Sequence, residues 1–204
     1  MSVLRHAIEA VRDKKGGAML NALRELRVHA YHGDVAGDRI LGILLENASI
    51  PYMDMLRKWL EYGVLSDPSA EFMIEFHTTK TWEERYTLKM EHVINGFFST
   101  KVTVDRVLAT GRFLNALQEC HETENRIEEV VKNATETVLC YTTNAARISS
   151  FIQTMYHRAS RSLVRLLLED YNLIGSLRVM KRYFLTDHTD LFVCLSTTSD
   201  AAHH

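Results

Sequence analysis

Only two prolines, Pro51 and Pro68, interrupt this chain of 204 residues, and nine glycines accompany them. Because proline removes a backbone hydrogen-bond donor and glycine adds conformational freedom, so small a number of both permits long helices. The apolar residues recur at intervals of three and four, which is the helical period. Such stripes occur at Val3, Leu4, Ala7, Ile8 and Val11; at Met19, Leu23, Leu26 and Ala30; at Ile40, Leu41, Leu44, Leu45 and Ala48; at Tyr52, Leu56, Trp59 and Leu60; and at Val104, Val107, Leu108, Gly111, Leu114 and Leu117. The sequence therefore predicts an all-α fold.

The segment around the two prolines carries the clearest boundary signals. Pro51 is expected to open a helix, since its fixed φ suits a first helical turn, and Gly63 is expected to end that helix. Residues 67–69, Asp-Pro-Ser, are typical of a turn. Residues 71–76 are short, aromatic and apolar, which favours an extended segment. We expect helix again from about Tyr86.

The most regular pattern lies in the second half of the chain. Ten residues alternate steps of four and three, namely Ile127, Val131, Ala134, Val138, Tyr141, Ala145, Ile148, Ile152, Met155 and Ala159. An unbroken helix of this length would extend about 50 Å. Its flanking residues are Thr, Ser and Asn rather than the Glu and Lys of a coiled-coil zipper, so one amphipathic helix in a bundle is the favoured interpretation. Helical periodicity continues to residue 184, and the polar tail from Ser196 is expected to fray.

Composition excludes several classes of protein. The net charge is −2 and 46% of the residues are hydrophobic, so neither a nucleic-acid partner nor a membrane partner is predicted, and partners should be recognised by shape and apolar contact. The three cysteines, Cys120, Cys140 and Cys194, have no CxxC spacing, which argues against a disulfide framework and a zinc knuckle. With no apolar leader and no apolar run of membrane-spanning length, the chain is expected to be soluble and not secreted.

No residue pattern predicts catalysis, a cofactor or a small-molecule substrate. Among the ten histidines, His29 and His32 are three apart, but no third metal ligand stands at a recognisable spacing. Gly16 and Gly17 are not followed by the residues of a phosphate-binding loop, and no serine stands in a GxSxG turn. Trp59 lies on an apolar stripe and is predicted to be a core residue. A basic edge at Arg178, Lys181 and Arg182 fits a solvated helix face better than a partner-binding edge.

Three ordered stretches resemble one protein family. The first is PYMDMLRKWLEYGVLSDPSAEF, and its matching residues are Pro51, Tyr52, Leu56, Trp59, Gly63, Leu65, Asp67, Pro68, Glu71 and Phe72. The second combines an aromatic pair with the helical run VDRVLATGRFLN, and its matching residues include Trp82, Tyr86, Gly111, Leu114 and Asn115. The third is YNLIGSLRVMKRYFLTDHTDLF, matched at Leu173, Leu177, Arg178, Lys181, Tyr183, Phe184, Leu185, Asp187, Asp190 and Phe192.

These stretches resemble the gamma-tubulin complex component family, the spindle-pole-body proteins. Within that family, their sequence is most similar to component two. The chain departs from the family pattern at residues 94–96, where a proline is usual, and at residues 188–189, where a Gln-Gly turn is usual. The resemblance implies helical bundles joined by a long helix. Residues 1–118 would end an N-terminal domain, 119–154 would form a variable helical linker, and 155–204 would begin a truncated C-terminal, gamma-tubulin-binding domain.

The implied function is that of a non-enzymatic scaffold in microtubule nucleation. Its partners would be gamma-tubulin and other components of the complex, and its location the cytoplasm and cytoskeleton at a microtubule-organising centre, such as a centrosome, spindle pole or basal body. The residues of the first two stretches would be structural, and those of the third would be candidates for partner binding. Two alternatives remain open, an all-helical metal-dependent hydrolase using His29 and His32, and a helical adaptor unrelated to tubulin.

Overall fold

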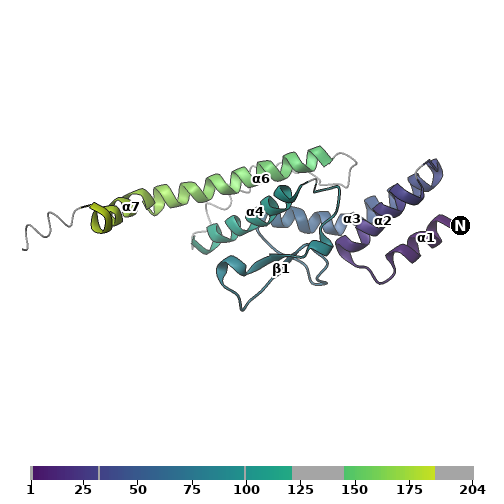
Figure 1. Ribbon diagram of the computed structural model, residues 1–204, viewed down its shortest axis with the longest axis horizontal. Helices are drawn as coiled ribbons and strands as arrows, with labels where there is room; N and C mark the ends of the chain where they lie inside the picture. Colours follow the sequence, from purple (N-terminus) through teal and green to yellow (C-terminus); the bar gives the residue numbers. More distant parts are fainter. Residues whose placement is uncertain (1, 32, 99, 121–144, 187–204) are drawn as a thin grey trace, which may run out of the picture. The chain divides into compact units, whose positions relative to one another are not determined.

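The computed structural model describes residues 2–31, 33–98, 100–120 and 145–186, which fold into two compact units, Met1–Arg161 and Ser162–His204. Six α-helices and a two-stranded sheet account for most of these residues (Figure 1). The helices are α1 (Ser2–Val11), α2 (Gly16–Ala30), α3 (Val35–Tyr62), α4 (Lys101–Cys120), α6 (Ala145–Arg165) and α7 (Leu173–Lys181), and the strands are β1 (Ile74–Phe76) and β2 (Tyr86–Leu88). None of the helices in these ranges is long and apolar enough to cross a membrane.

The long helix α3 is the centre of the first unit. It packs against α1 and α2 on one side and against α4 on another (Figure 1). Asp34 caps its start by accepting a hydrogen bond from the amide of Ala36 at 3.1 Å, and Gly63 ends it in the left-handed conformation at φ 68°. Positive φ carries little penalty for glycine, so the predicted end of this helix at Gly63 is confirmed.

Pro51 lies inside α3, so the prediction that it opens a new helix is wrong. The two apolar stripes on either side of it belong to one continuous helix of 28 residues. Proline withdraws the amide that would bond to the carbonyl of Asn47, four residues earlier. Both Pro51 and Asn47 are exposed, so water can reach this carbonyl and the break in the hydrogen-bond ladder is tolerated.

The fold is mostly helical rather than all-α, because β1 and β2 form an antiparallel hairpin with Ile74 opposite Leu88 and Phe76 opposite Tyr86. The extended segment predicted at residues 71–76 thus contains a strand. The helix predicted from about Tyr86 is wrong, since residues 86–88 are the second strand. Strands of three residues are too short to show a periodic pattern, and here tertiary pairing decides the backbone conformation.

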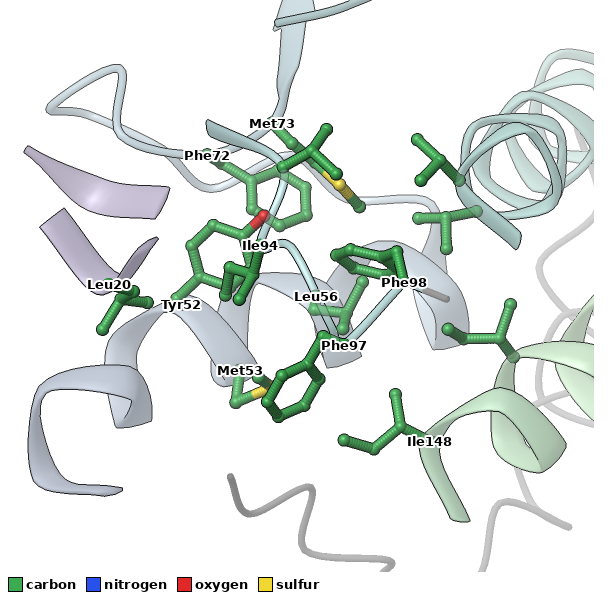
Figure 2. Packing of buried hydrophobic residues seen from close by; sticks show 14 of the residues in the cluster. Leu20, Tyr52, Met53, Leu56, Phe72, Met73, Ile94, Phe97, Phe98 and Ile148 are labelled. Atoms are coloured by element: carbon green, nitrogen blue, oxygen red, sulfur yellow. The ribbon is translucent and has the colours of Figure 1, made fainter. Parts of the chain in front are cut away.

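The core of the first unit joins all these elements around the second half of α3. Figure 2 shows Tyr52, Met53 and Leu56 of α3 surrounded by residues from α2 and from the loops that flank the hairpin. Ile148, Ile152 and Met155 of α6 belong to the same cluster and are buried. The predicted seam is therefore helical from Ala145 on and buried from Ile148 to Ala159, whereas its residues 127–144 lie outside the described ranges.

The described part of the second unit, residues 162–186, is helical and mostly exposed. A π-helical turn (Leu166–Asp170) follows α6, and a second one (Arg182–Thr186) follows α7. Asn172 begins α7 in the left-handed conformation, and its side-chain oxygen accepts a hydrogen bond from the amide of Gly175 at 3.3 Å. Leu166 is buried, but no residue of α7 is.

Candidate partner-binding site

The crossing of α3 and α4 is built around Trp59, which is fully buried. Its indole N–H donates a hydrogen bond of 2.8 Å to the carbonyl of Val107, and its ring lies 5.0 Å from that of Tyr86, centroid to centroid. A Cβ atom placed on Gly111 would come within 1.9 Å of the Trp59 ring. Glycine at 111 therefore allows α4 to approach the indole closely, and α3 and α4 are in direct contact at this point.

Asn115 ties three elements together one turn further along α4. Its side-chain nitrogen donates to the carbonyls of Gly63 and Gly111, both at 2.8 Å, and its oxygen accepts from the hydroxyl of Tyr86 at 3.0 Å. The carbonyl of Gly63 belongs to the end of α3, where no intrahelical donor is present. The amide of Asn115 thus satisfies this carbonyl and fixes the hairpin to both helices. Burial raises the pKa of the Tyr86 phenol above its ordinary value.

A second group of motif residues closes the turn after α3. The carboxylate of Asp67 accepts hydrogen bonds from the amides of Glu71 and Phe72 at 2.9 and 2.8 Å. Phe72 is fully buried, and its ring lies 5.2 Å from that of Tyr52. The hydroxyl of Tyr52 donates to the carbonyl of His92 at 2.8 Å, while burial, and secondarily the charge of Asp67, raises the pKa of this phenol.

The remaining motif residues of the first two stretches divide between core and surface. Leu56 and Leu114 are buried, whereas Pro51, Pro68 and Trp82 are exposed. Trp82 retains 41% of its accessible surface on a short turn between the strands. It therefore contributes less to the core than the other tryptophan does.

The candidate partner-binding residues of the third stretch lie on α7 and the π-helical turn after it. Leu173, Leu177, Arg178, Lys181, Tyr183 and Phe184 are all exposed. Leu177 retains 53% and Phe184 68% of their accessible surface. Leu173, Leu177 and Met180 are spaced by four and three, so they lie along one side of α7, and Phe184 follows in the π-helical turn. Asp187, Asp190 and Phe192 lie outside the described ranges.

The tyrosine and phenylalanine at the end of this segment stack edge to face, with ring centroids 5.1 Å apart. Arg178 and Lys181 stand in the last turn of α7, where positive charge interacts favourably with the helix dipole. The arrangement presents an apolar row beside a basic edge. A contiguous exposed apolar surface is a feature of protein–protein interaction sites.

Sequence reasoning missed a polar contact between α3 and α6. The side chain of Glu61 retains only 4% of its accessible surface, and its carboxylate receives a hydrogen bond from Arg57 at 3.1 Å. Arg158 of α6 attracts the same carboxylate. Burial nevertheless outweighs both arginines and raises the pKa of Glu61, and burial also lowers the pKa of Arg158. No sequence signal marks Glu61, because its position on the helical stripe looks like that of a surface residue.

Tyr156 completes the attachment of α6 to α4. Its ring lies 5.9 Å from that of Phe113, and the guanidinium of Arg106 stands 5.9 Å from its centroid. Such aromatic and cation–π contacts add to the burial of Ile148, Ile152 and Met155. The helix is thus held by an apolar row with polar contacts along both of its edges.

The metal-site alternative gains no support from the described part of the chain. There, no three His, Cys, Asp or Glu residues come together as metal ligands. His29 is exposed at the end of α2, and His32 lies outside the described ranges. His92 is buried with its Nδ1 atom lacking a hydrogen bond, but its ring approaches only one carboxylate, that of Glu91 at 3.6 Å.

The first unit is a packed helical scaffold, and the helix α7 of the second unit is exposed. Residues 1–170 match the family model described as gamma tubulin complex component N-terminal, so the chain belongs to the gamma-tubulin complex component family. It is 31% identical over 220 residues to spindle pole body component alp4 of Schizosaccharomyces pombe, with 98% of this chain and 27% of that protein covered. It is 32% identical over 190 residues to gamma-tubulin complex component 2 of Mus musculus, with 87% and 20% covered.

The chain therefore spans only about a fifth to a quarter of the length of these relatives. It is also similar to gamma-tubulin complex component 3 of Homo sapiens, at 26% identity over 202 residues. These comparisons confirm the predicted family of the chain, and the matched family model contains the first two motif stretches.

Replacing Trp59 by Ala should lower the free energy of unfolding by about 3 to 5 kcal/mol, since a large buried ring leaves a cavity. Replacing it by Phe should cost less, because a ring remains and only the bond to the Val107 carbonyl and part of the volume are lost. Urea unfolding followed by circular dichroism measures both. An unfolding midpoint that stays the same in the alanine variant would show that Trp59 does not pack as described.

Replacing Asn115 by Ala should lower the free energy of unfolding by about 1 to 3 kcal/mol, because the Gly63 carbonyl and the Tyr86 hydroxyl lose their partner. Gln118 provides a matched control on the same helix, since its side chain donates one bond, to the carbonyl of Tyr62 at 2.7 Å. Thermal denaturation of both variants compares them. An equal or smaller loss in the Asn115 variant would contradict the three-way connection.

Replacing Glu61 by Gln should leave the thermal midpoint at pH 7 unchanged or raise it, because burial has already raised the pKa of this carboxyl in the folded state. A raised folded-state pKa means that the native protein binds the proton more tightly than the unfolded chain does. The wild type should therefore gain stability relative to the variant as the pH falls through that pKa. Thermal melts between pH 4.5 and 7.5 test this, and a gain with rising pH would contradict it.

Proposed function

We propose that this chain acts as a non-enzymatic scaffold of a gamma-tubulin complex in microtubule nucleation, packing laterally against other components and contributing to gamma-tubulin binding. The observation that carries the proposal is the family match over residues 1–170. The motif residues inside that range add support, because Trp59, Gly111 and Asn115 join α3, α4 and the hairpin through buried contacts. A rigid unit of this kind suits a protein whose task is to hold partners at a fixed spacing.

The proposed mechanism is geometric. A nucleus of several tubulins is rare because each subunit loses translational and rotational freedom when it joins. A scaffold that already holds gamma-tubulins at the right spacing removes most of that entropy loss from the slow step. The chain's residues would act by position and packing.

The proposed organisation assigns residues 1–118 to the end of an N-terminal helical domain and 119–154 to a variable linker. Residues 155–204 would begin the gamma-tubulin-binding domain. The N-terminal family model extends to residue 170, so it includes the proposed linker and the first residues assigned here to the next domain, and a second compact unit starts at Ser162. The proposed location is the cytoplasm and cytoskeleton at a microtubule-organising centre. Relatives named as spindle pole body components, in two yeasts, support that location.

The third motif stretch is proposed to face gamma-tubulin or the bundle that binds it. Its apolar row at Leu173, Leu177, Met180 and Phe184 has too little surrounding structure in the described unit to be covered. A binding surface without its supporting helices loses both contact area and preorganisation. The chain by itself should therefore bind gamma-tubulin weakly and associate with other components more readily.

The test is a pull-down of the tagged chain from cell extract, with recovered proteins identified by mass spectrometry. Other gamma-tubulin complex components should be recovered together with little gamma-tubulin, and a generic adaptor would recover neither. Light scattering of the purified chain should show oligomers that diminish when Leu177 and Phe184 are replaced by Ser. Replacing the exposed residues Val28 and Val102 by Ser is the matched control and should change nothing. Tight one-to-one binding of gamma-tubulin by a monomer would contradict this proposal.

A further inference from the structure

Helix α6 has an unusual distribution of charge. Its 21 residues contain four arginines, at positions 147, 158, 161 and 165, and neither aspartate nor glutamate. One row consists of residues seven apart, namely Arg147, Thr154 and Arg161. A second row consists of Arg158 and Arg165, which are also seven apart. The two rows run side by side along the helix. The whole chain has a net charge of −2, and this helix therefore differs sharply from the average.

The rows lie beside the buried seam of α6 and point away from it. Ile148, Ile152 and Met155 face the core, whereas Arg147 and Arg161 are exposed. Arg147 and Arg161 form no ion pair within the part of the chain that the structure describes. Arg158 is attracted by Glu61, and Arg165 bonds to Glu169 at 2.8 Å. Two of the four arginines are thus committed locally, and two remain exposed about 21 Å apart along the helix.

The acidic groups on the adjoining face of α3 are already paired. Asp54 accepts from Lys58 at 2.7 Å and from Arg57 at 2.9 Å, and Glu61 accepts from Arg57 at 3.1 Å. Hydrogen bonds from Lys58 and then from Arg57 lower the pKa of Asp54, so this carboxylate is fully charged at neutral pH. Two carboxylates, Asp54 and Glu61, thus interact with three cations, which are Arg57, Lys58 and Arg158.

The contacts among the described residues do not account for the exposed arginines of α6. Arg161 stands three residues from Arg158 and four from Arg165, and like charges at these spacings destabilise a helix. An exposed helix ordinarily alternates the two signs of charge, which gives solubility without repulsion. Glu61 and Glu169 offset this repulsion at Arg158 and Arg165, but no ion pair among the described residues offsets it at Arg161, and binding to a partner would do so.

We propose that Arg147 and Arg161, with Thr154 between them, form a docking surface for an acidic helical segment of a partner protein. Two turns of helix advance about 10 Å, so a partner helix lying alongside α6 with glutamates every seven residues would place carboxylates opposite both arginines. The planar guanidinium matches a carboxylate through two parallel hydrogen bonds. A nucleic acid fits less well, because its continuous phosphates need a broad basic surface and this chain is negative overall.

The proposal is tested with the complete chain and a fluorescein-labelled, alanine-rich peptide of 21 residues that carries glutamate along one face at heptad spacing. Fluorescence anisotropy should show binding that weakens as the salt concentration rises. A matched peptide with glutamine in place of glutamate should bind at least tenfold more weakly. Failure of the glutamate peptide to bind, or equal binding of both peptides, would overturn the proposal.

The double variant R147E/R161E should lower the affinity for the glutamate peptide at least tenfold. The control variant K80E/K101E changes the net charge by the same amount at exposed positions outside α6 and should change the affinity less than twofold. Circular dichroism should show the same helical content in all three proteins. An equal loss in the control, or tighter binding of a 21-nucleotide single-stranded DNA that is lost in R147E/R161E, would refute a peptide-specific surface.

Discussion

The contact between the Trp59 indole and Gly111 is the constraint on which the first unit depends. A side chain of any size at position 111 would overlap the indole, so α4 reaches this depth only because the residue is glycine. The indole N–H is then near enough to bond to the Val107 carbonyl, and its ring supports Tyr86 of the hairpin. One close approach thus fixes the positions of two helices and a strand, and the hydrogen bonds of Asn115 hold them there.

Apolar periodicity in the sequence predicted the helices well wherever one face of the helix is buried and the other is exposed to solvent. The stripes of α2, α4 and α6 have such faces, and Leu23, Val107 and Ile152 are examples of their residues in the core, although Ala30 at the end of the α2 stripe is exposed. Pro51 misled the prediction because the rule for proline concerns the hydrogen-bond ladder, whereas exposure decides the cost of breaking it. The hairpin could not be predicted in full, because Tyr86 is held in a strand by pairing with Phe76 and by the Arg112 guanidinium, which bonds to its carbonyl. These contacts come from residues distant in sequence.

The candidate sites differ in how far sequence could reveal them. The motif residues of α3 and α4 are recognisable as a family pattern, and the structure supplies the reason for several of them, since they form one connected set of buried contacts. The apolar row of α7 was visible as a helical stripe, but a stripe does not say whether the chain itself covers it. The described second unit leaves Leu177 and Phe184 exposed. Whether another protein buries this apolar row depends on the assembly, and the periodicity of one sequence gives no information about that.

The distribution of charge is a second property that the sequence average does not reveal. A net charge of −2 predicts that the chain as a whole attracts no polyanion, and that inference concerns the average. Helix α6 carries charge of one sign only. The fold shows that Glu61 interacts with Arg57 and Arg158, while Arg147 and Arg161 form no ion pair with the described residues. Burial raises the pKa of Glu61, so the charge pairs that this acid forms with Arg57 and Arg158 are offset in part by the cost of removing its carboxylate from water. Packing therefore accounts for Arg158, and it leaves Arg147 and Arg161 exposed.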